Sequence, residues 1–145
     1  MAGEQQARVV VGVDGSPSSV EALRWVLRYA TAMNRDVVMI TAWDVPMSMG
    51  YPTVFDGVDW AGEARTVADK ALADTADLRS GVDVTADVVH GHPANVLVDA
   101  SKDAELLVVG SRGHGTAVGM LLGSVSQHCV HRAGCPVVVV RAPAE

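Results

Sequence analysis

The chain contains four short runs of almost wholly apolar, mostly branched residues, and these runs constrain its fold more than any other feature. They occupy residues 9–13, 37–40, 106–109 and 137–140. Each run is too short for a core helix, and continuous apolar runs of this length are typical of strands buried on both faces of a parallel sheet. A fifth segment, residues 82–88, alternates apolar and polar residues, which predicts a strand near an edge of the sheet.

Helical patterns separate the predicted strands. Apolar residues three and four positions apart predict four helices, over residues 17–30, 64–78 (ending near Gly81), 93–100 and 124–133. Pro17 after Ser16, and a capping box of Ser18 with Glu21, indicate where the first helix begins. This alternation predicts one α/β domain over residues 1–145, an open five-stranded parallel sheet with helices on both faces. Residues 44–58 are predicted to be a loop over the carboxyl ends of the strands.

Composition excludes several classes of protein. Of the 145 residues, 49% are hydrophobic and 19% charged, which is not the composition of a disordered chain. The net charge of -6 and the scattered arginines argue against a nucleic-acid partner. No apolar run approaches the roughly 20 residues that span a bilayer. Cys129 and Cys135, without a secretion signal, do not predict a disulfide framework. We therefore expect a soluble, cytoplasmic protein with no membrane partner.

A glycine-rich segment follows the fourth predicted strand. Residues 110–126 read GSRGHGTAVGMLLGSVS. Glycine allows the main chain to approach a ligand closely, and the helix that follows offers unpaired N–H groups and the positive end of its dipole. This arrangement indicates an anion site suited to phosphates, to which Ser124 and Ser126 add hydroxyl groups. The alternative is a plain flexible turn, because the spacing matches neither a Walker loop nor a dinucleotide fingerprint.

The turn after the first predicted strand supplies a carboxylate, Asp14. In a doubly wound sheet, ligands bind at the carboxyl ends of neighbouring strands where the strand order reverses. If the first and fourth strands are neighbours, Asp14 faces the glycine-rich segment. There it would accept a ribose hydroxyl or hold a magnesium ion that bridges phosphates. The alternative is that Asp14 only caps the turn into the helix.

These segments resemble the universal stress protein family. Residues 9–16, 108–113 and 135–141 are similar to its first, fourth and last strands with their turns. The spacing Gly110-x2-Gly113-x9-Gly123-Ser124 is similar to the family's nucleotide-binding signature, without departure. The resemblance covers nearly the whole chain. It implies an open sheet with strand order 3-2-1-4-5 and a site for ATP, with Mg²⁺ as its companion ion.

The resemblance also implies a role for each matching position. In the first half of the chain, Gly12 and Val13 line the floor of the site, Asp14 lies by the ribose or the metal, and Ala42 touches adenine. In the second half, the residues that wrap the ribose and first phosphate are Gly110, Arg112 and Gly113, and those that hold the phosphates are Gly123, Ser124, Val125 and Ser126. No catalytic residue is predicted.

The last predicted strand suggests a partner. Residues 137–140 are apolar on both faces, yet the strand order places them at an edge of the sheet, and an exposed apolar edge favours pairing with another chain. The family resemblance implies the same two-fold homodimer. The alternative is that residues 142–145 cover the edge. We expect a dimeric, ATP-binding sensor or regulator of the stress response, acting on an unidentified regulatory protein. The alternatives are a slow ATP hydrolase or nucleotidyl transferase, or an interaction scaffold whose pocket is ligand-free or takes cyclic AMP.

Overall fold

The strands form where the apolar runs predict them, because branched apolar side chains pack well on a buried, pleated surface. The computed structural model describes residues 8–45, 47–48, 51–52, 58–112 and 122–142. Its elements in chain order are β1 (Arg8–Gly12), α2 (Pro17–Met33), β2 (Asp36–Trp43), β3 (Met47–Ser48), β4 (Tyr51–Pro52), α3 (Trp60–Asp74), the 3₁₀ helix η1 (Ala76–Leu78), β5 (Val84–His90), α4 (Pro93–Ser101), β6 (Leu106–Gly110), α5 (Ser124–Arg132) and β7 (Val137–Val140).

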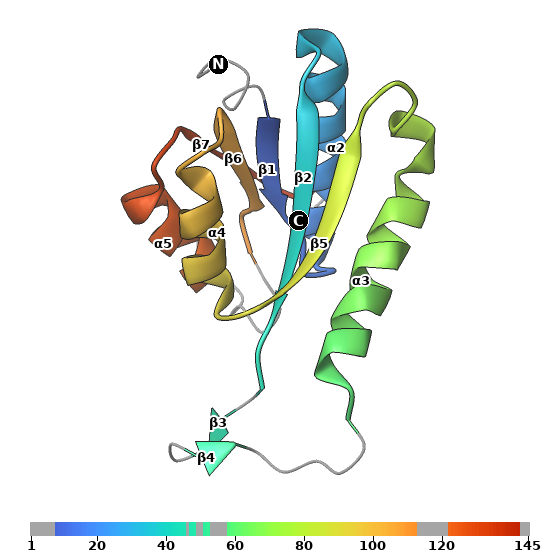
Figure 1. The fold of residues 1–145 in the computed structure, drawn as a ribbon. Helices are drawn as coiled ribbons and strands as arrows, with labels where there is room; N and C mark the ends of the chain where they lie inside the picture. Colours follow the sequence, from blue (N-terminus) through green and yellow to red (C-terminus); the bar gives the residue numbers. More distant parts are fainter. Residues whose placement is uncertain (1–7, 46, 49–50, 53–57, 113–121, 143–145) are drawn as a thin grey trace.

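The long strands form one open parallel sheet in the spatial order β5-β2-β1-β6-β7 (Figure 1). Numbered by the five predicted strands, this is the order 3-2-1-4-5, so the predicted fold class is confirmed. In the central strand β1, Val9 lies opposite Val37 of β2 on one side and Leu106 of β6 on the other. The chain therefore winds from β1 toward one edge and from β6 toward the other.

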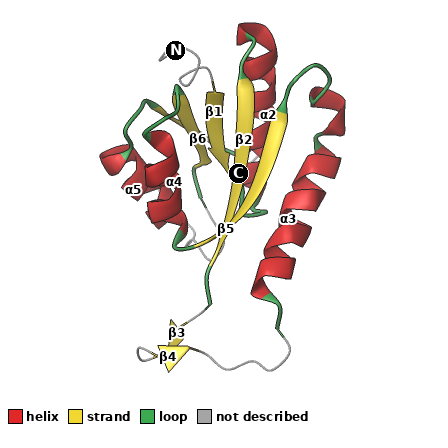
Figure 2. Ribbon diagram, in the orientation of Figure 1, coloured by secondary structure: helices red, strands yellow, loops and turns green. Residues whose placement is uncertain are grey.

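Helices cover both faces of the sheet (Figure 2). On one face, α2 and α3 pack over a buried cluster that includes Val9, Val11 and Leu23. On the other, α4 and α5 pack over a second cluster, which includes Val10 and Leu107. Neighbouring residues of a strand point to opposite faces, so β1 contributes to both clusters in turn. Each fully buried Val or Leu contributes about 1.5–3 kcal/mol relative to an exposed one. The central strands therefore anchor both layers.

The ends of α2 set where the chain leaves β1 and enters β2. Ser16 is the N-cap and Pro17 takes the first helical position, where its missing N–H is not needed. Asn34 ends the helix in the left-handed conformation, with φ of 56°. The predicted capping box is wrong. The buried Ser18 hydroxyl bonds to the main chain just after β6, and the Glu21 carboxylate pairs with Arg24 on the next turn of α2.

α3 begins and ends earlier in the chain than predicted. It ends at Asp74, and one turn of 3₁₀ helix follows before the chain reaches Gly81. The Thr75 hydroxyl donates to the carbonyl of Ala71 at 2.9 Å. A threonine hydroxyl that bonds to the preceding turn offers the main chain an alternative to the regular helical ladder, which explains why the apolar spacing outlasts the helix.

The segment between β2 and α3, predicted to be a loop, contains a short antiparallel ladder. Met47 pairs with Pro52, and Ser48 pairs with Tyr51. Residues 46, 49–50 and 53–57 lie outside the described residues. A two-residue strand gives no periodicity that sequence analysis detects.

β5 and β7 are the two edge strands of the sheet. In β5, half-buried residues mostly alternate with exposed ones, as its sequence predicts. All four valines of β7 are half-buried. Within the described ranges, no helix combines the length and the apolar character needed to cross a membrane.

Candidate functional site

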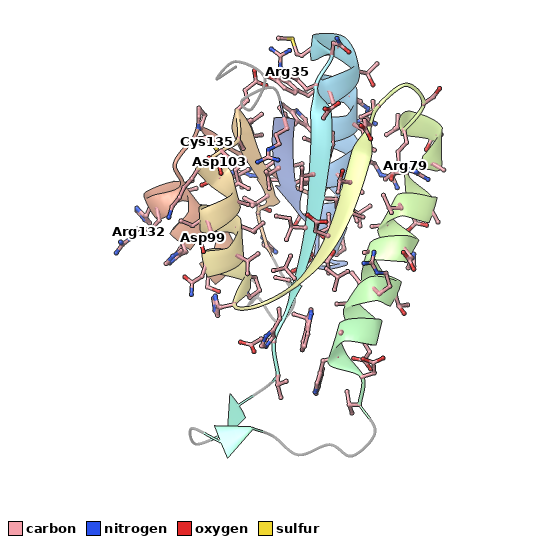
Figure 3. The ribbon with its side chains drawn as sticks, viewed as in Figure 1. Arg35, Arg79, Asp99, Asp103, Arg132 and Cys135 are labelled. Atoms are coloured by element: carbon pink, nitrogen blue, oxygen red, sulfur yellow. The ribbon has the colours of Figure 1, made fainter. Side chains whose placement is uncertain are left out.

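The strand order creates a crevice at the carboxyl ends of β1 and β6. From β1 the chain crosses through α2 to β2, whereas from β6 it passes through α5 to β7 on the opposite side. Because the two connections diverge, they leave a space between these strand ends, and open α/β sheets bind ligands at such points. Arg35 lies at the opposite, amino end of the sheet (Figure 3), where its guanidinium pairs with Glu105 at 3.1 Å.

A pocket with about 520 Å³ of empty space, its open mouth included, occupies this crevice. The predicted site residues that line it are Gly12, Val13, Asp14, Ala42, Gly110, Arg112, Val125 and Ser126. Two short sequence segments far apart in the chain therefore meet where the strand order predicts. Gly123 and Ser124 do not line the pocket, and Gly113 lies outside the described residues.

Sequence analysis missed part of the pocket wall. The further lining residues are Ser19, Ile40, Pro93, Leu97 and Val109. Ile40 stands two positions before Ala42 on the same strand, so the period of two along β2 was a signal that both residues face the same way. Pro93 and Leu97 are four apart on α4 and thus share a helix face. What the sequence does not show is that this face closes over the ends of β1 and β2.

The lining divides into an apolar and a polar part. The apolar residues are Val13, Ile40, Ala42, Pro93, Leu97, Val109 and Val125. The polar ones are Asp14, Ser19, Arg112 and Ser126. Binding sites for small molecules commonly combine such an apolar wall with a few polar groups that fix orientation. The division suits a ligand with a flat apolar ring at one end and charged oxygens at the other.

The turn from β1 into α2 holds the Asp14 carboxylate in place. Asp14 Oδ1 accepts from the Ser16 N–H at 2.9 Å and from the Ser16 hydroxyl at 2.5 Å. Ser19 Oγ accepts from the Asp14 N–H at 3.3 Å and donates to the Ser16 carbonyl at 2.9 Å. Gly15 has φ of 86°, a conformation that glycine adopts at no steric cost. Asp14 therefore both organises the turn and lines the pocket.

The exit of β6 is held by hydroxyl groups from two helices. The Ser126 hydroxyl of α5 donates to the carbonyl of Gly110 at 2.5 Å. The Ser18 hydroxyl of α2 donates to the carbonyl of Arg112 at 2.7 Å. In this arrangement the Ser126 proton is directed at the protein, so toward the pocket that side chain offers only oxygen lone pairs.

The N-terminus of α5 is joined to the end of β6. The Gly123 N–H donates to the Ser111 carbonyl at 2.7 Å, and the Ser111 N–H donates to Val140 of β7 at 2.8 Å. Gly123 is the N-cap of α5 and Ser124 opens the helix. A helix begins with N–H groups that have no partner within the helix, and these attract anions. Val125 and Ser126, in that first turn, line the pocket.

One carboxylate at the pocket limits which metal the site suits. Among the residues that the structure describes, no group of three or more His, Cys, Asp or Glu side chains is placed to hold a metal ion. Asp14 is the one carboxylate among the lining residues that belong to the described ranges. Mg²⁺ keeps several waters and is commonly bound by one or two carboxylates plus phosphate oxygens. The donor set therefore fits Mg²⁺ that arrives with a phosphate ligand, and not a metal held by protein groups alone.

Comparison with known proteins places this geometry in context. The family model described as the universal stress protein family matches residues 7–141. Universal stress protein Rv2623 of Mycobacterium tuberculosis is 40% identical over 141 residues, which are 94% of this chain and 46% of that protein. Universal stress protein Mb2028c of Mycobacterium bovis is 37% identical over 140 residues, with the same coverages. The chain spans about half the length of these curated relatives.

Solved structures share the fold. A universal stress protein in complex with cAMP superimposes with a TM-score of 0.69 and 30% identity, over 94% of this chain and 98% of that one. A universal stress protein family member from Arabidopsis thaliana with AMP bound gives a TM-score of 0.64 and 22% identity, over 95% and 93% of the two chains. The second comparison, at lower identity, supports the arrangement of strands and helices alone.

Proposed function

Because this chain belongs to the universal stress protein family, we propose that it binds an adenine nucleotide, ATP, in the pocket between the ends of β1 and β6. The observation that carries the proposal is that two predicted segments meet in one pocket at the point where the strand order reverses. Residues 12–14 come from the first segment, and Gly110, Arg112, Val125 and Ser126 come from the second. The 30% identical structure in complex with cAMP supports a ligand of the adenine nucleotide class.

The apolar wall is suited to the base. Adenine is flat and largely apolar on its faces, and Ile40, Leu97 and Val109 offer apolar side chains around it. Ala42 adds little bulk at the end of β2, which leaves room for a ring. The ordinary driving force for such an insertion is the removal of apolar area from water, about 25 cal/mol per Å².

The polar part is suited to ribose and phosphates. The Arg112 guanidinium is a natural phosphate partner because its planar N–H groups bond two oxygens at once. The first turn of α5 adds main-chain N–H groups. Asp14 would accept a ribose hydroxyl or share Mg²⁺ with the phosphates. In the sequence, the signature Gly110-x2-Gly113-x9-Gly123-Ser124 brackets the segment that joins Arg112 to α5.

Cyclic AMP is the second candidate ligand, because the 30% identical structure is a complex with it. A single cyclic phosphate needs fewer donors than a triphosphate and does not bridge Mg²⁺. We favour ATP because the family's nucleotide-binding signature is present in full and the first turn of α5 offers main-chain N–H groups in addition to Arg112.

The rest of the proposal concerns assembly and role. We propose that two chains pair along the open edge of β7, and that nucleotide occupancy is reported to a regulatory partner during stress. The half-buried valines of β7 support an edge that is completed by a second copy.

The test is calorimetric titration of the full chain with Mg-ATP, AMP and cAMP, together with mass analysis of any nucleotide that co-purifies. We expect ATP to bind more tightly than cAMP, and Arg112→Ala to weaken ATP at least tenfold. Arg132→Ala is the matched control, because that arginine extends from α5 away from the sheet (Figure 3). If wild-type protein binds none of the three ligands, the proposed function is wrong. Preference for cAMP would replace ATP by the second candidate.

A further inference from the structure

The Ser18 hydroxyl lies in the first turn of α2 but bonds to a residue outside that helix. Its side chain is nearly fully buried, at 2% exposed. The hydroxyl donates to the Arg112 carbonyl at 2.7 Å and accepts from the Arg112 N–H at 3.2 Å. One side chain thus holds both main-chain polar groups of a residue 94 positions away. Serine near a helix N-terminus more commonly bonds to its own helix.

A second hydroxyl nearby does not duplicate this contact. Ser16 Oγ lies 3.2 Å from the Arg112 carbonyl, but only 2.5 Å from the Asp14 carboxylate. A hydroxyl has one proton, and a hydrogen bond to a charged oxygen is the stronger one. Ser16 therefore serves mainly the Asp14 turn, and Ser18 is the main donor to Arg112.

The main chain of β6 approaches Ser18 closely. A Cβ atom at Gly110 would lie 2.5 Å from Ser18 Oγ and 2.7 Å from the Ser18 carbonyl carbon. Ser126 holds the Gly110 carbonyl from the other side. The strand exit is therefore fixed between α2 and α5, and Arg112 leaves it in a direction set by Ser18.

We propose that Ser18 is a positioning residue for polyphosphate binding, acting through Arg112. The inference rests on the proposed function, since it presumes that the pocket binds a nucleotide. Bidentate guanidinium–phosphate bonds are directional, and a binding group works only when its supporting contacts hold it within about half an ångström. Adenosine, which carries no phosphate, does not depend on Arg112 in this way.

The experiment compares Mg-ATP with adenosine. For Ser18→Ala in the full chain, we expect ATP affinity to fall about tenfold, because an Arg112 that is no longer held must be ordered when the phosphates bind. We expect adenosine affinity to stay within about twofold of wild type. Ser18→Cys keeps nearly the same size but offers a weak donor, so it should show the same selective loss to a smaller degree. Ser18→Cys also serves as the test if the alanine variant does not fold.

Ser101→Ala is the matched control. Ser101 is also fully buried, and its hydroxyl also makes two hydrogen bonds, to the Val98 carbonyl at 2.6 Å and from the Gly134 N–H at 2.8 Å. We expect it to lower the unfolding temperature without changing ATP affinity. Unchanged ATP affinity in both Ser18 variants would overturn the inference, as would an equal loss for ATP and adenosine. If wild-type protein binds neither ligand, it is the proposed function that fails.

Discussion

At the scale of single residues, the site depends on a close approach between β6 and α2 that only glycine permits. We predict that Gly110→Ala destabilises the fold by about 2 kcal/mol, because the new methyl group would overlap main-chain atoms of Ser18 and Ser19, which have no other rotamer to adopt. Urea unfolding measures the change.

Gly12→Ala is the comparison for that prediction. Its Cβ would meet a side-chain carbon of Leu97 at 2.7 Å, and a side chain can rotate away. We therefore expect a smaller loss of stability at Gly12 than at Gly110. The reverse order would show that the contact between β6 and α2 is looser than the structure has it.

Burial of a thiol makes stability depend on alkaline pH. Cys129 is fully buried, and this burial raises the pKa of its thiol from 9.0 to about 11. Because the folded pKa lies above the unfolded one, the contribution of this thiol is complete below pH 9 and is lost as the pH rises toward about 11. We predict that the unfolding free energy of wild type falls more steeply over that interval than that of Cys129→Ala.

Comparing how the unfolding free energies of the two proteins change with pH cancels the contribution of the other groups that titrate at alkaline pH, since both proteins carry them. Burial also raises the pKa of Cys135, a half-buried thiol. If Cys129→Ala has the same dependence on pH as wild type, the Cys129 thiol does not titrate differently in the folded and unfolded states.

At the scale of elements, the sequence predicts what depends on local patterns. A strand buried on both faces needs a continuous apolar run, so β1 and β6 are visible in the sequence. Glycines next to the end of a strand are also a local signal, and they predict one side of the pocket. The wall formed by Pro93 and Leu97 is different, because it exists only once α4 has packed over the end of β1.

The end of α3 is another feature that the local sequence pattern does not predict. The apolar spacing continues through Leu78, but the Thr75 hydroxyl competes for the last carbonyls and the helix stops. Likewise, Ser18 has the spacing of a capping box, but its hydroxyl bonds to Arg112. In both cases a polar side chain has two possible partners, and the tertiary structure selects one.

The start of α3 gives a prediction for an element. Asp59 is its N-cap, and the carboxylate accepts from the Gly62 N–H at 2.9 Å. We predict that Asp59→Ala lowers the unfolding free energy by about 1 kcal/mol, the usual value of such a cap. Asp59→Asn retains an acceptor and should lose only a fraction of that. Equal losses in the two variants would mean that the charge, and not the hydrogen bond, is what stabilises the helix start.

At the scale of the whole molecule, the proposed dimer depends on the edge strand β7. The Leu107 N–H donates to the Pro136 carbonyl, and the Ser111 N–H donates to the Val140 carbonyl. Polar groups of successive residues in a strand point to opposite sides. The N–H and C=O of Val137 and Val139 therefore point away from β6, toward the edge where a second copy would pair.

We predict that Val139→Pro converts the proposed dimer of two 15.1 kDa chains into a monomer without unfolding it, because proline removes an edge N–H that the sheet itself does not use. Val138→Pro, one position earlier, removes an N–H directed at β6 and should destabilise the fold. Sedimentation and thermal unfolding measure the two effects. A Val139→Pro protein that remains dimeric would place the contact elsewhere.

The central pair of strands also has a consequence for how the molecule matures. Ser16 and Arg112, which meet beside the pocket, are 96 positions apart in the chain, and β1 and β6 lie side by side although three helices and two long strands separate them in sequence. During synthesis, the residues on the β1 side of the crevice are made well before those on the β6 side. The proposed nucleotide site is therefore incomplete on a nascent chain until β6, the fourth long strand, has paired with β1.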